Sequence, residues 1–157
     1  MEPTVATTLF VIGDFDGENF VKEKVYYSEY GKDFYAPQTL LTPQGERVMI
    51  AWFYHWGKPL AEGETTAGAF SIPCNVDLVD NELKIYPVKK CQKLLKSTCD
   101  LVEFNGKNLV IKQNGIEFAN HDLSNVKVDK IEYILDKKLL EIFINDGQFY
   151  ITQWLVK

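Results

Sequence analysis

Aromatic, acidic and amide side chains are concentrated between residues 31 and 56 of this 157-residue chain. The segment Gly31-Lys-Asp-Phe-Tyr-Ala-Pro-Gln38 leads, after a short turn, into Arg47-Val-Met-Ile-Ala-Trp-Phe-Tyr-His-Trp56. Aromatic rings stack on the apolar faces of sugars, and their heteroatoms bond to hydroxyl groups. This composition suits the wall of a pocket for a polar ligand. The competing interpretation is that these rings are ordinary core and strand-end aromatics, which strands favour in any case.

Acid–base and nucleophilic chemistry have few candidates in the chain. Asp33 is the acid embedded in the aromatic segment, and its alternative role is that of a strand-end carboxylate bonded to a backbone amide. A retaining glycosidase needs two carboxylates about 5–5.5 Å apart, a separation that a sequence does not reveal. Of the two histidines, only His55 is a candidate base for a nucleophile, and no residue orders it. Neither Gly-x-Ser-x-Gly nor a phosphate-binding glycine loop occurs.

The sequence carries no metal-binding or cofactor-binding pattern. Its three cysteines, Cys74, Cys91 and Cys99, are odd in number and lack a Cys-x-x-Cys spacing, so we expect free thiols, although Cys91 and Cys99 could pair geometrically. Asp14 and Asp16 have the spacing of calcium ligands, but the rest of a twelve-residue calcium loop is missing. We therefore interpret this pair as turn chemistry and expect neither metal nor cofactor.

Charge and hydropathy exclude several classes of partner. The net charge is −5, with 46% hydrophobic and 25% charged residues, as in an ordinary soluble globular protein. Because no basic stripe is present, we expect no nucleic-acid partner. No apolar run reaches the roughly 18 residues of a membrane span, and the first residues lack the positive region of a signal peptide. We expect a cytoplasmic protein without membrane contact.

Short strands must position the aromatic segment. Pro37 cannot donate a ladder hydrogen bond, so it marks a strand start, an edge or a bulge. Residues 47–53 form a near-continuous apolar run, as in a strand covered on both faces. A boundary or short helix is expected within 89–96. We predict an all-β chain, with further strands and hairpins at 7–12, 20–27, 69–73, 75–78, 82–88, 101–104, 109–112, 116–119, 130–135, 139–144 and 149–156.

Five motifs, in order along the chain, resemble glycoside hydrolase family 32, which comprises invertases, β-fructosidases and sucrose-6-phosphate hydrolases. The matching pieces are Asp33-Phe-Tyr-Ala-Pro-Gln38, Ala51-Trp-Phe-Tyr-His-Trp56, Gly68-Ala-Phe-Ser-Ile-Pro73, Asn81-Glu-Leu-Lys-Ile-Tyr-Pro87 and Leu140-Glu-Ile-Phe-Ile-Asn-Asp-Gly147. The resemblance implies the last blade or blades of a five-bladed β-propeller at 1–88, followed by a shortened β-sandwich-like module at 89–157. It also implies that Tyr35 and Trp56 form the wall of a fructoside site, with Asp33 and Gln38 supporting them.

The catalytic motifs of that family are absent from the chain. The family nucleophile lies in Trp-Met-Asn-Asp-Pro-Asn-Gly, a transition-state aspartate in Arg-Asp-Pro and the acid/base in Glu-Cys, and none of these occurs here. Cys74 stands where the family has the arginine of Ser-Leu-Pro-Arg. Without a nucleophile and a proton donor, the double displacement lacks its covalent step and its leaving-group protonation.

Two hypotheses follow from the resemblance and its gaps. The first is a C-terminal portion of a β-fructofuranosidase that is inactive alone. The second is a non-catalytic carbohydrate-binding or assembly module. The partners expected are a fructose-containing sugar and either further copies of the chain or another chain that supplies the missing blades.

Overall fold

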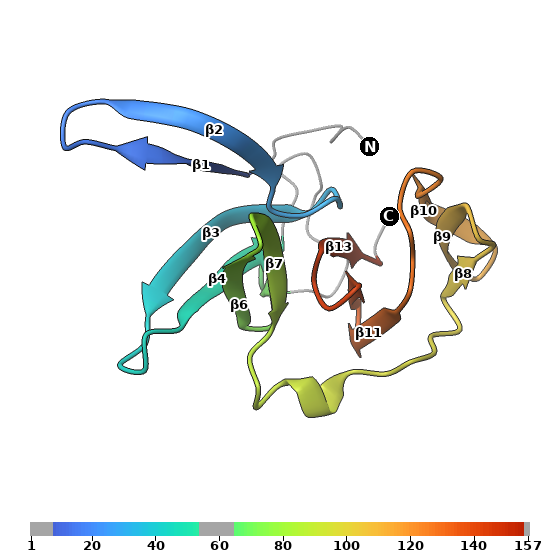
Figure 1. Ribbon diagram of the computed structural model, residues 1–157. Coiled ribbons are helices and arrows are strands. Elements are labelled where there is room, and N and C mark those ends of the chain that lie inside the picture. Colours follow the sequence, from blue (N-terminus) through green and yellow to red (C-terminus); the bar gives the residue numbers. More distant parts are fainter. Residues whose placement is uncertain (1–7, 54–64, 156–157) are drawn as a thin grey trace.

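The protein is described here by a computed structural model that covers residues 8–53 and 65–155. This part of the chain contains thirteen strands and one 3-10 helix, η1 (Figure 1). The all-β class predicted from the sequence is confirmed. The elements are β1 (Leu9–Phe15), β2 (Phe20–Tyr27), β3 (Phe34–Leu41), β4 (Arg47–Phe53), β5 (Ala69–Phe70), β6 (Cys74–Val79), β7 (Glu82–Pro87), η1 (Gln92–Leu94), β8 (Val102–Phe104), β9 (Asn108–Gln113), β10 (Ile116–Asp122), β11 (Ile131–Asp136), β12 (Leu139–Ile144) and β13 (Phe149–Trp154).

The strands form four antiparallel sheets. β1 and β2 make an isolated hairpin, and β3-β4-β6-β7 is a meander to which β5 adds beside β4. The strands β8-β9-β10 and β11-β12-β13 form two three-stranded sheets. Residues that tolerate positive φ close the hairpins, as at Asp80 and Asn81, whose φ angles are 51° and 58°. This explains why the turn signals in the sequence located the hairpins well.

Several strand predictions need correction at their ends. The strand expected at 116–119 runs on to Asp122, and the strand expected at 149–156 ends at Trp154. The first strand continues past Gly13 to Phe15, because a bulge between Ile12 and Gly13 lets the ladder resume beyond the glycine. The strand expected at 69–73 stops at Phe70. Beyond that point, the backbone N–H of Ile72 donates to a buried side chain rather than to a neighbouring strand.

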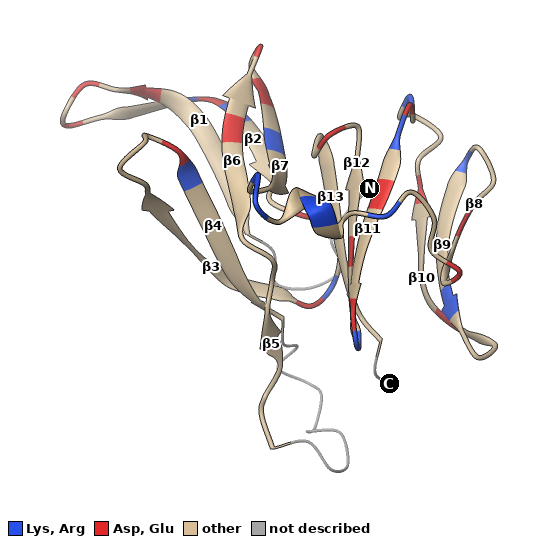
Figure 2. Cartoon of the chain, turned by 90° about the horizontal axis from the view of Figure 1, so that it is seen from below, with Lys and Arg blue, Asp and Glu red and all other residues tan. Residues whose placement is uncertain are grey.

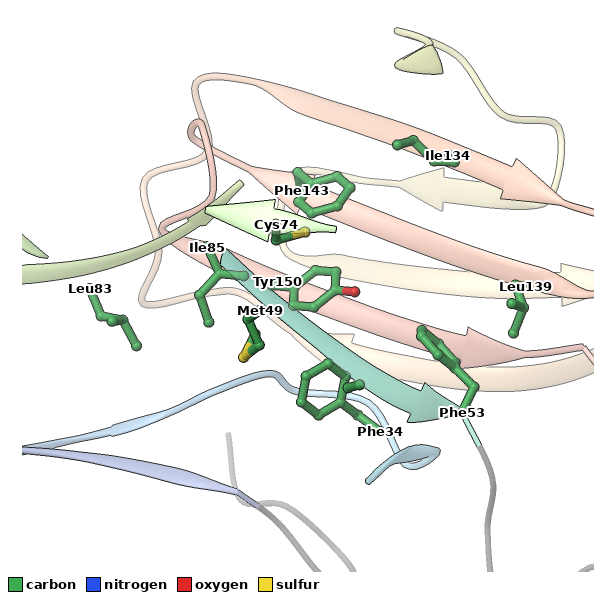
Figure 3. Close-up of a cluster of buried hydrophobic side chains, with 11 residues drawn as sticks. Phe34, Met49, Phe53, Cys74, Leu83, Ile85, Ile134, Leu139, Phe143 and Tyr150 are labelled. Carbon is green, nitrogen blue, oxygen red and sulfur yellow. The ribbon is translucent and has the colours of Figure 1, made fainter. Parts of the chain in front are cut away.

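The sheet β11-β12-β13 lies between the other two large sheets, and every residue of β12 is buried. One face packs against the meander sheet, with Phe143 stacked on Tyr150 at 4.9 Å between ring centroids (Figure 3). The other face packs against β8-β9-β10 through Leu140, Ile142 and Ile144. The apolar core is therefore continuous across residue 88, and the proposed division into 1–88 and 89–157 stays a prediction.

The cysteines, the acidic turn after β1 and the distribution of charge were also considered in the sequence. Cys74, Cys91 and Cys99 are all free thiols, as predicted. The Asp16 carboxylate accepts hydrogen bonds from the backbone N–H groups of Glu18 and Asn19 at 2.8 and 2.7 Å, which is the turn role expected for it. Figure 2 shows acidic and basic residues interspersed along the chain. In the described ranges, no helix is long and apolar enough to cross a membrane.

Candidate functional site

Tyr35 lies near the start of β3, next to a bulge that includes Pro37, for which the sequence predicted a strand start, an edge or a bulge. The pairing with β4 shifts between Tyr35 and Gln38, and Ala36 adopts a φ of 45°. Pro37 has no N–H to lose from the ladder, so the extra residue is accommodated here at low cost. β3 is also an edge strand of the meander. The prediction that Pro37 marks an edge or a bulge is confirmed.

The bulge places Tyr35 and Gln38 on the same face of the sheet. Tyr35 pairs with Trp52, and Gln38 pairs with Ile50, so three steps along β3 match two steps along β4. Because directly paired residues share a face and strands alternate with period two, all four side chains project to one side. Gln38 is exposed there. Two of the residues predicted for the site are thus brought together.

An aromatic row crosses three strands on this face. The rings of Tyr35 and Trp52 meet edge to face, with centroids 6.4 Å apart, and Trp52 pairs in turn with Phe70 of β5. The Trp52 indole N–H donates to the carbonyl oxygen of Ala67 at 2.7 Å. This bond fixes the indole, and the 75% exposed Phe70 extends the apolar surface. We define the aromatic wall as Tyr35, Trp52 and Phe70.

Asp33 does not belong to the surface of the wall. Its side chain is 1% exposed, and its Oδ2 atom accepts a hydrogen bond from the backbone N–H of Trp154 at 3.0 Å. The Nε2 atom of Gln153 lies 3.5 Å from the same oxygen. Asp33 thus joins the chain just before β3 to the edge of β13, which matches the alternative of a strand-end carboxylate bonded to a backbone amide. Asp33 therefore contributes to the wall indirectly, by holding the start of β3 against β13.

Glu29 is a second buried carboxylate on the edge of β13. It is 4% exposed, and its Oε2 atom accepts hydrogen bonds from the backbone N–H of Gly31 and from the hydroxyl of Thr152, the latter at 2.9 Å. The backbone N–H of Tyr30 donates to the carbonyl of Tyr150 at 2.9 Å. Burial raises the pKa of Glu29 to about 7, against the opposing effect of these hydrogen bonds. Glu29 and Asp33 thus attach the chain before β3 to this edge of the sheet through hydrogen bonds to Thr152 and Trp154.

Gly31 makes this close approach possible. A Cβ atom on Gly31 would lie 2.0 Å from the carbonyl oxygen of Thr152, closer than atoms can pack. Glycine is required here for space, because its φ is not in the left-handed region. The glycine that opens the aromatic segment therefore brings the segment against β13.

Glu141 links the middle sheet to the meander. It is 4% exposed, and its carboxylate accepts hydrogen bonds from the backbone N–H of Ile72 at 2.8 Å and from the Tyr150 hydroxyl. Burial raises the pKa of Glu141 to about 7. The sequence places Glu141 between apolar residues of an alternating strand, which suggests an exposed side chain. Nothing local indicates that a second sheet covers this face.

The site as described is suited to binding rather than to bond cleavage. The aromatic wall, with Gln38 beside it, offers stacking surfaces and an amide. The carboxylates of Glu29, Asp33 and Glu141 lie on the buried side of the meander sheet, where they bond to the chain itself. Trp56 and His55 lie outside the described residues, so the place of Trp56 in the wall stays a prediction.

Comparison with known proteins shows the family to which this chain belongs. Residues 3–87 match the model of the glycosyl hydrolases family 32 N-terminal domain, so the chain belongs to this family. It is 32% identical over 91 residues to the sucrose-6-phosphate hydrolase of Zymomonas mobilis, covering 56% of this chain and 18% of that protein. The sucrose-6-phosphate hydrolase of Vibrio alginolyticus is 28% identical over 163 residues, covering 87% of this chain and 31% of that protein. The raffinose invertase of Escherichia coli is 37% identical over 67 residues, covering 42% of this chain and 14% of that protein.

Solved structures of the family have the same fold. The GH32 β-fructofuranosidase BmSUC1 of Bombyx mori superimposes with a TM-score of 0.74 and 20% identity, covering 96% of this chain and 42% of that one. The sucrose-6-phosphate hydrolase of Lactobacillus gasseri gives a TM-score of 0.67 and 18% identity, covering 86% of this chain and 39% of that one. These neighbours combine a β-propeller with a β-sandwich, and the predicted fold class is confirmed. The matches cover less than a third of the length of the Zymomonas mobilis, Escherichia coli and Vibrio alginolyticus enzymes.

Proposed function

We propose that the chain is the C-terminal portion of a β-fructofuranosidase, which contributes the aromatic wall of the sugar site and does not hydrolyse its substrate alone. The observation that carries this proposal is the aromatic wall itself, set on one exposed face with Gln38 while the nearby acids are buried. Membership of family 32 and the names of the relatives support a fructoside as the ligand.

The chemistry of the wall follows from its contacts. The ring of Trp52 is fixed through its indole N–H, so it would act on a sugar through its face alone. The Tyr35 hydroxyl and the Gln38 amide would bond to sugar hydroxyls, because both groups donate and accept hydrogen bonds. Cleavage of the glycosidic bond would need a nucleophile and a proton donor from another polypeptide segment, because the three family motifs for these steps are missing from this sequence.

The test is a hydrolysis assay with sucrose and sucrose 6-phosphate. The purified chain alone is expected to release neither glucose nor fructose above the rate of buffer. Addition of the part of the Vibrio alginolyticus enzyme that precedes its match to this chain is expected to generate hydrolysis. Turnover by the chain alone at enzyme-like rates, lost in Asp33→Asn, would overturn the proposal.

A second candidate is a carbohydrate-binding or assembly module with no hydrolytic partner. It is favoured by the many exposed apolar side chains in residues 9–79. The two candidates differ in the assay with added enzyme part: the module would bind sugar or assemble with itself, but hydrolysis would not appear. A cytoplasmic location is proposed for both.

A further inference from the structure

The segment that joins the meander sheet to β8 runs from β7 through η1 and past β11 (Figure 1). Lys96 forms an isolated antiparallel bridge with Tyr133, in which each backbone N–H donates to the carbonyl of the other residue at 2.9 Å. Continuation of this antiparallel register by two residues sets Leu94 opposite Leu135. All four residues line a cavity of about 480 Å³, which lies between the joining segment, β11 and the end of β9.

The apolar floor of this cavity lies where the cover of β11 ends. Tyr133 packs in the cluster that joins β11-β12-β13 to β8-β9-β10. Leu135 lies two residues further along the same strand, so its side chain points to the same face. Tyr133 is 7% exposed and Leu135 is 48% exposed, so the facing sheet covers the first residue and not the second. In the described ranges after residue 79, three large hydrophobic residues are exposed, and two of them, Leu94 and Leu135, line the cavity.

Polar side chains surround the apolar floor. Lys96, Thr98 and Asp100 come from the joining segment, and Gln113 is the last residue of β9. Within the described part of the chain, none of these four side chains makes a hydrogen bond or an ion pair with another residue, and the Tyr133 hydroxyl makes none either. These groups therefore remain available to a ligand, which is the arrangement of a binding pocket with a few convergent polar groups.

The composition of this rim selects among classes of small molecule. An anion would face the Asp100 carboxylate, and a cation would face the Lys96 ammonium group. A wholly apolar ligand would remove water from both charges without replacing the lost hydrogen bonds, which costs free energy. A polyhydroxy compound can accept from Lys96 and donate to Asp100, and it can do both with the Gln113 amide. A neutral polyhydroxy compound is therefore the class that matches every group of the rim.

We propose that this cavity is a second sugar site, which binds a fructose-containing sugar independently of the aromatic wall. The leucines of the floor contact the C–H faces of the sugar, and the rim bonds to its hydroxyl groups. The cavity volume is within the range of roughly 300–1,000 Å³ that ligand pockets occupy. Its lining residues fall between 94 and 135, so the two sites share no residue. The choice of a fructose-containing sugar among polyhydroxy compounds rests on the proposed function.

Cys99 provides a reporter inside the cavity. Cys91 and Cys99 are both half-buried, but of the two only Cys99 lines the cavity. A bound sugar should therefore slow the reaction of a thiol reagent with Cys99 and leave the reaction of Cys91 unchanged. Cys91 also corrects for the viscosity of the sugar solution. None of the described residues that line the cavity is a tryptophan, so tryptophan fluorescence does not report on this site.

The test measures the labelling rate of each thiol in the full chain by peptide mass spectrometry, as fructose or sucrose is added. When the sugar is present at roughly ten times its Kd, the rate at Cys99 is expected to fall about tenfold. Inorganic phosphate and n-butanol, which probe for an anion site and for an apolar cavity, should give no protection.

Two aspartate variants test the rim. Asp100→Ala should raise the sugar concentration that gives half-protection about tenfold, because it removes a charged hydrogen-bond acceptor. Asp77→Ala is the matched control, since Asp77 is an exposed aspartate on β6 that does not line the cavity, and it should leave this concentration unchanged. Tyr35→Ala, which removes a ring of the aromatic wall, should also leave the protection of Cys99 intact.

The inference would be overturned by equal protection of Cys91 and Cys99, by no protection with either sugar, or by protection with phosphate or n-butanol instead. Equal effects of the two aspartate variants, or loss of protection in Tyr35→Ala, would overturn it as well. Failure of the proposed function gives a different result. Selective protection of Cys99 in a chain whose aromatic wall binds no sugar would support the second site and contradict the role proposed for the wall.

Discussion

The Asp33 carboxylate accepts a hydrogen bond from the backbone N–H of Trp154, 121 positions further along the chain. This bond joins Asp33, two residues before Tyr35 of the aromatic wall, to β13, the last strand. Glu29 makes a similar connection to β13: it accepts a hydrogen bond from the hydroxyl of Thr152, which lies two residues before Trp154 on that strand. The position of the wall therefore depends on β13, although the family domain model that contains the wall ends at residue 87.

Removal of the negative charge at position 33 should destabilise the fold. Asp33→Asn retains an acceptor for the N–H of Trp154 but weakens a charge-assisted bond, and we expect a loss of about 1–3 kcal/mol in the free energy of unfolding. Urea denaturation of both variants measures this loss in the free energy of unfolding. The matched control is Asp77→Asn, on the exposed part of β6, which should change the free energy by less than about 0.5 kcal/mol. Equal effects at the two positions would contradict the role assigned to Asp33.

Substitution of Gly31 should push the aromatic segment away from β13. Gly31→Ala places a Cβ atom 2.0 Å from the Thr152 carbonyl oxygen, so the backbone must move. We expect a loss of roughly 2–4 kcal/mol. Gly106→Ala is the control, because its Cβ would meet nothing within 4 Å and only the φ of +88° causes strain, worth about 1 kcal/mol. If the two alanines cost the same, the close approach at Gly31 is not a constraint.

Stability should fall as the pH rises from about 4.5 to about 7, because of Glu141. Burial raises its pKa in the folded state to about 7, while the unfolded chain ionises near 4.5. In this window the folded state holds the proton and the unfolded state releases it, so the contribution is present below pH 4.5 and is lost as the pH rises through 7. The loss is on the order of 3 kcal/mol. Burial also raises the pKa of Glu29 to about 7, so Glu29 acts in the same sense. Glu141→Gln should therefore reduce the slope of the profile, measured by chemical denaturation at a series of pH values, and leave the part that comes from Glu29.

His121 acts in the opposite sense and must be separated from this effect. Burial lowers the pKa of its ring to about 4, so its contribution is present above pH 6.5 and is lost as the pH falls toward 4. Denaturation profiles in a His121→Gln background isolate the carboxylates. A profile that Glu141→Gln leaves unchanged in that background would contradict the burial of Glu141.

The three thiols should differ in reactivity. Cys74 is 1% exposed, and burial raises its pKa well above the usual value, so little thiolate forms and reagents are excluded. Cys91 and Cys99 are only half-buried. Titration with a thiol reagent should label two sulfurs in the folded protein and the third only in denaturant. Rapid labelling of Cys74 in the Cys91→Ser, Cys99→Ser variant would show that the core opens at this point.

The sequence predicts the strands well where local signals are complete. Residues 20–27, 47–53 and 139–144 were expected as strands and are β2, β4 and β12. Turn residues and β-branched or aromatic runs define such segments without reference to the rest of the chain. Pro37 likewise limits its position to a strand start, an edge or a bulge, because a missing N–H is a local property.

The candidate site could be predicted only in part, because its supports are not local. Tyr35 and Gln38 were placed together by an ordered motif, and the bulge explains how they come to share a face. The partners of Glu29 and Glu141 depend on how the sheets stack, and Glu29 bonds to a residue 123 positions away. An acidic residue two positions before a glycine, as in Glu29-Tyr30-Gly31, is a weak signal of such a contact.

The central claim is that the aromatic wall binds a fructose-containing sugar. The most direct measurement is a titration of the chain with fructose and sucrose, followed by tryptophan fluorescence, in the unaltered protein and in Tyr35→Ala and Phe15→Ala. The account predicts a saturable change that Tyr35→Ala abolishes and that Phe15→Ala, at an exposed ring on the hairpin, leaves intact. No change with either sugar, or a change of equal size in Tyr35→Ala, would contradict it.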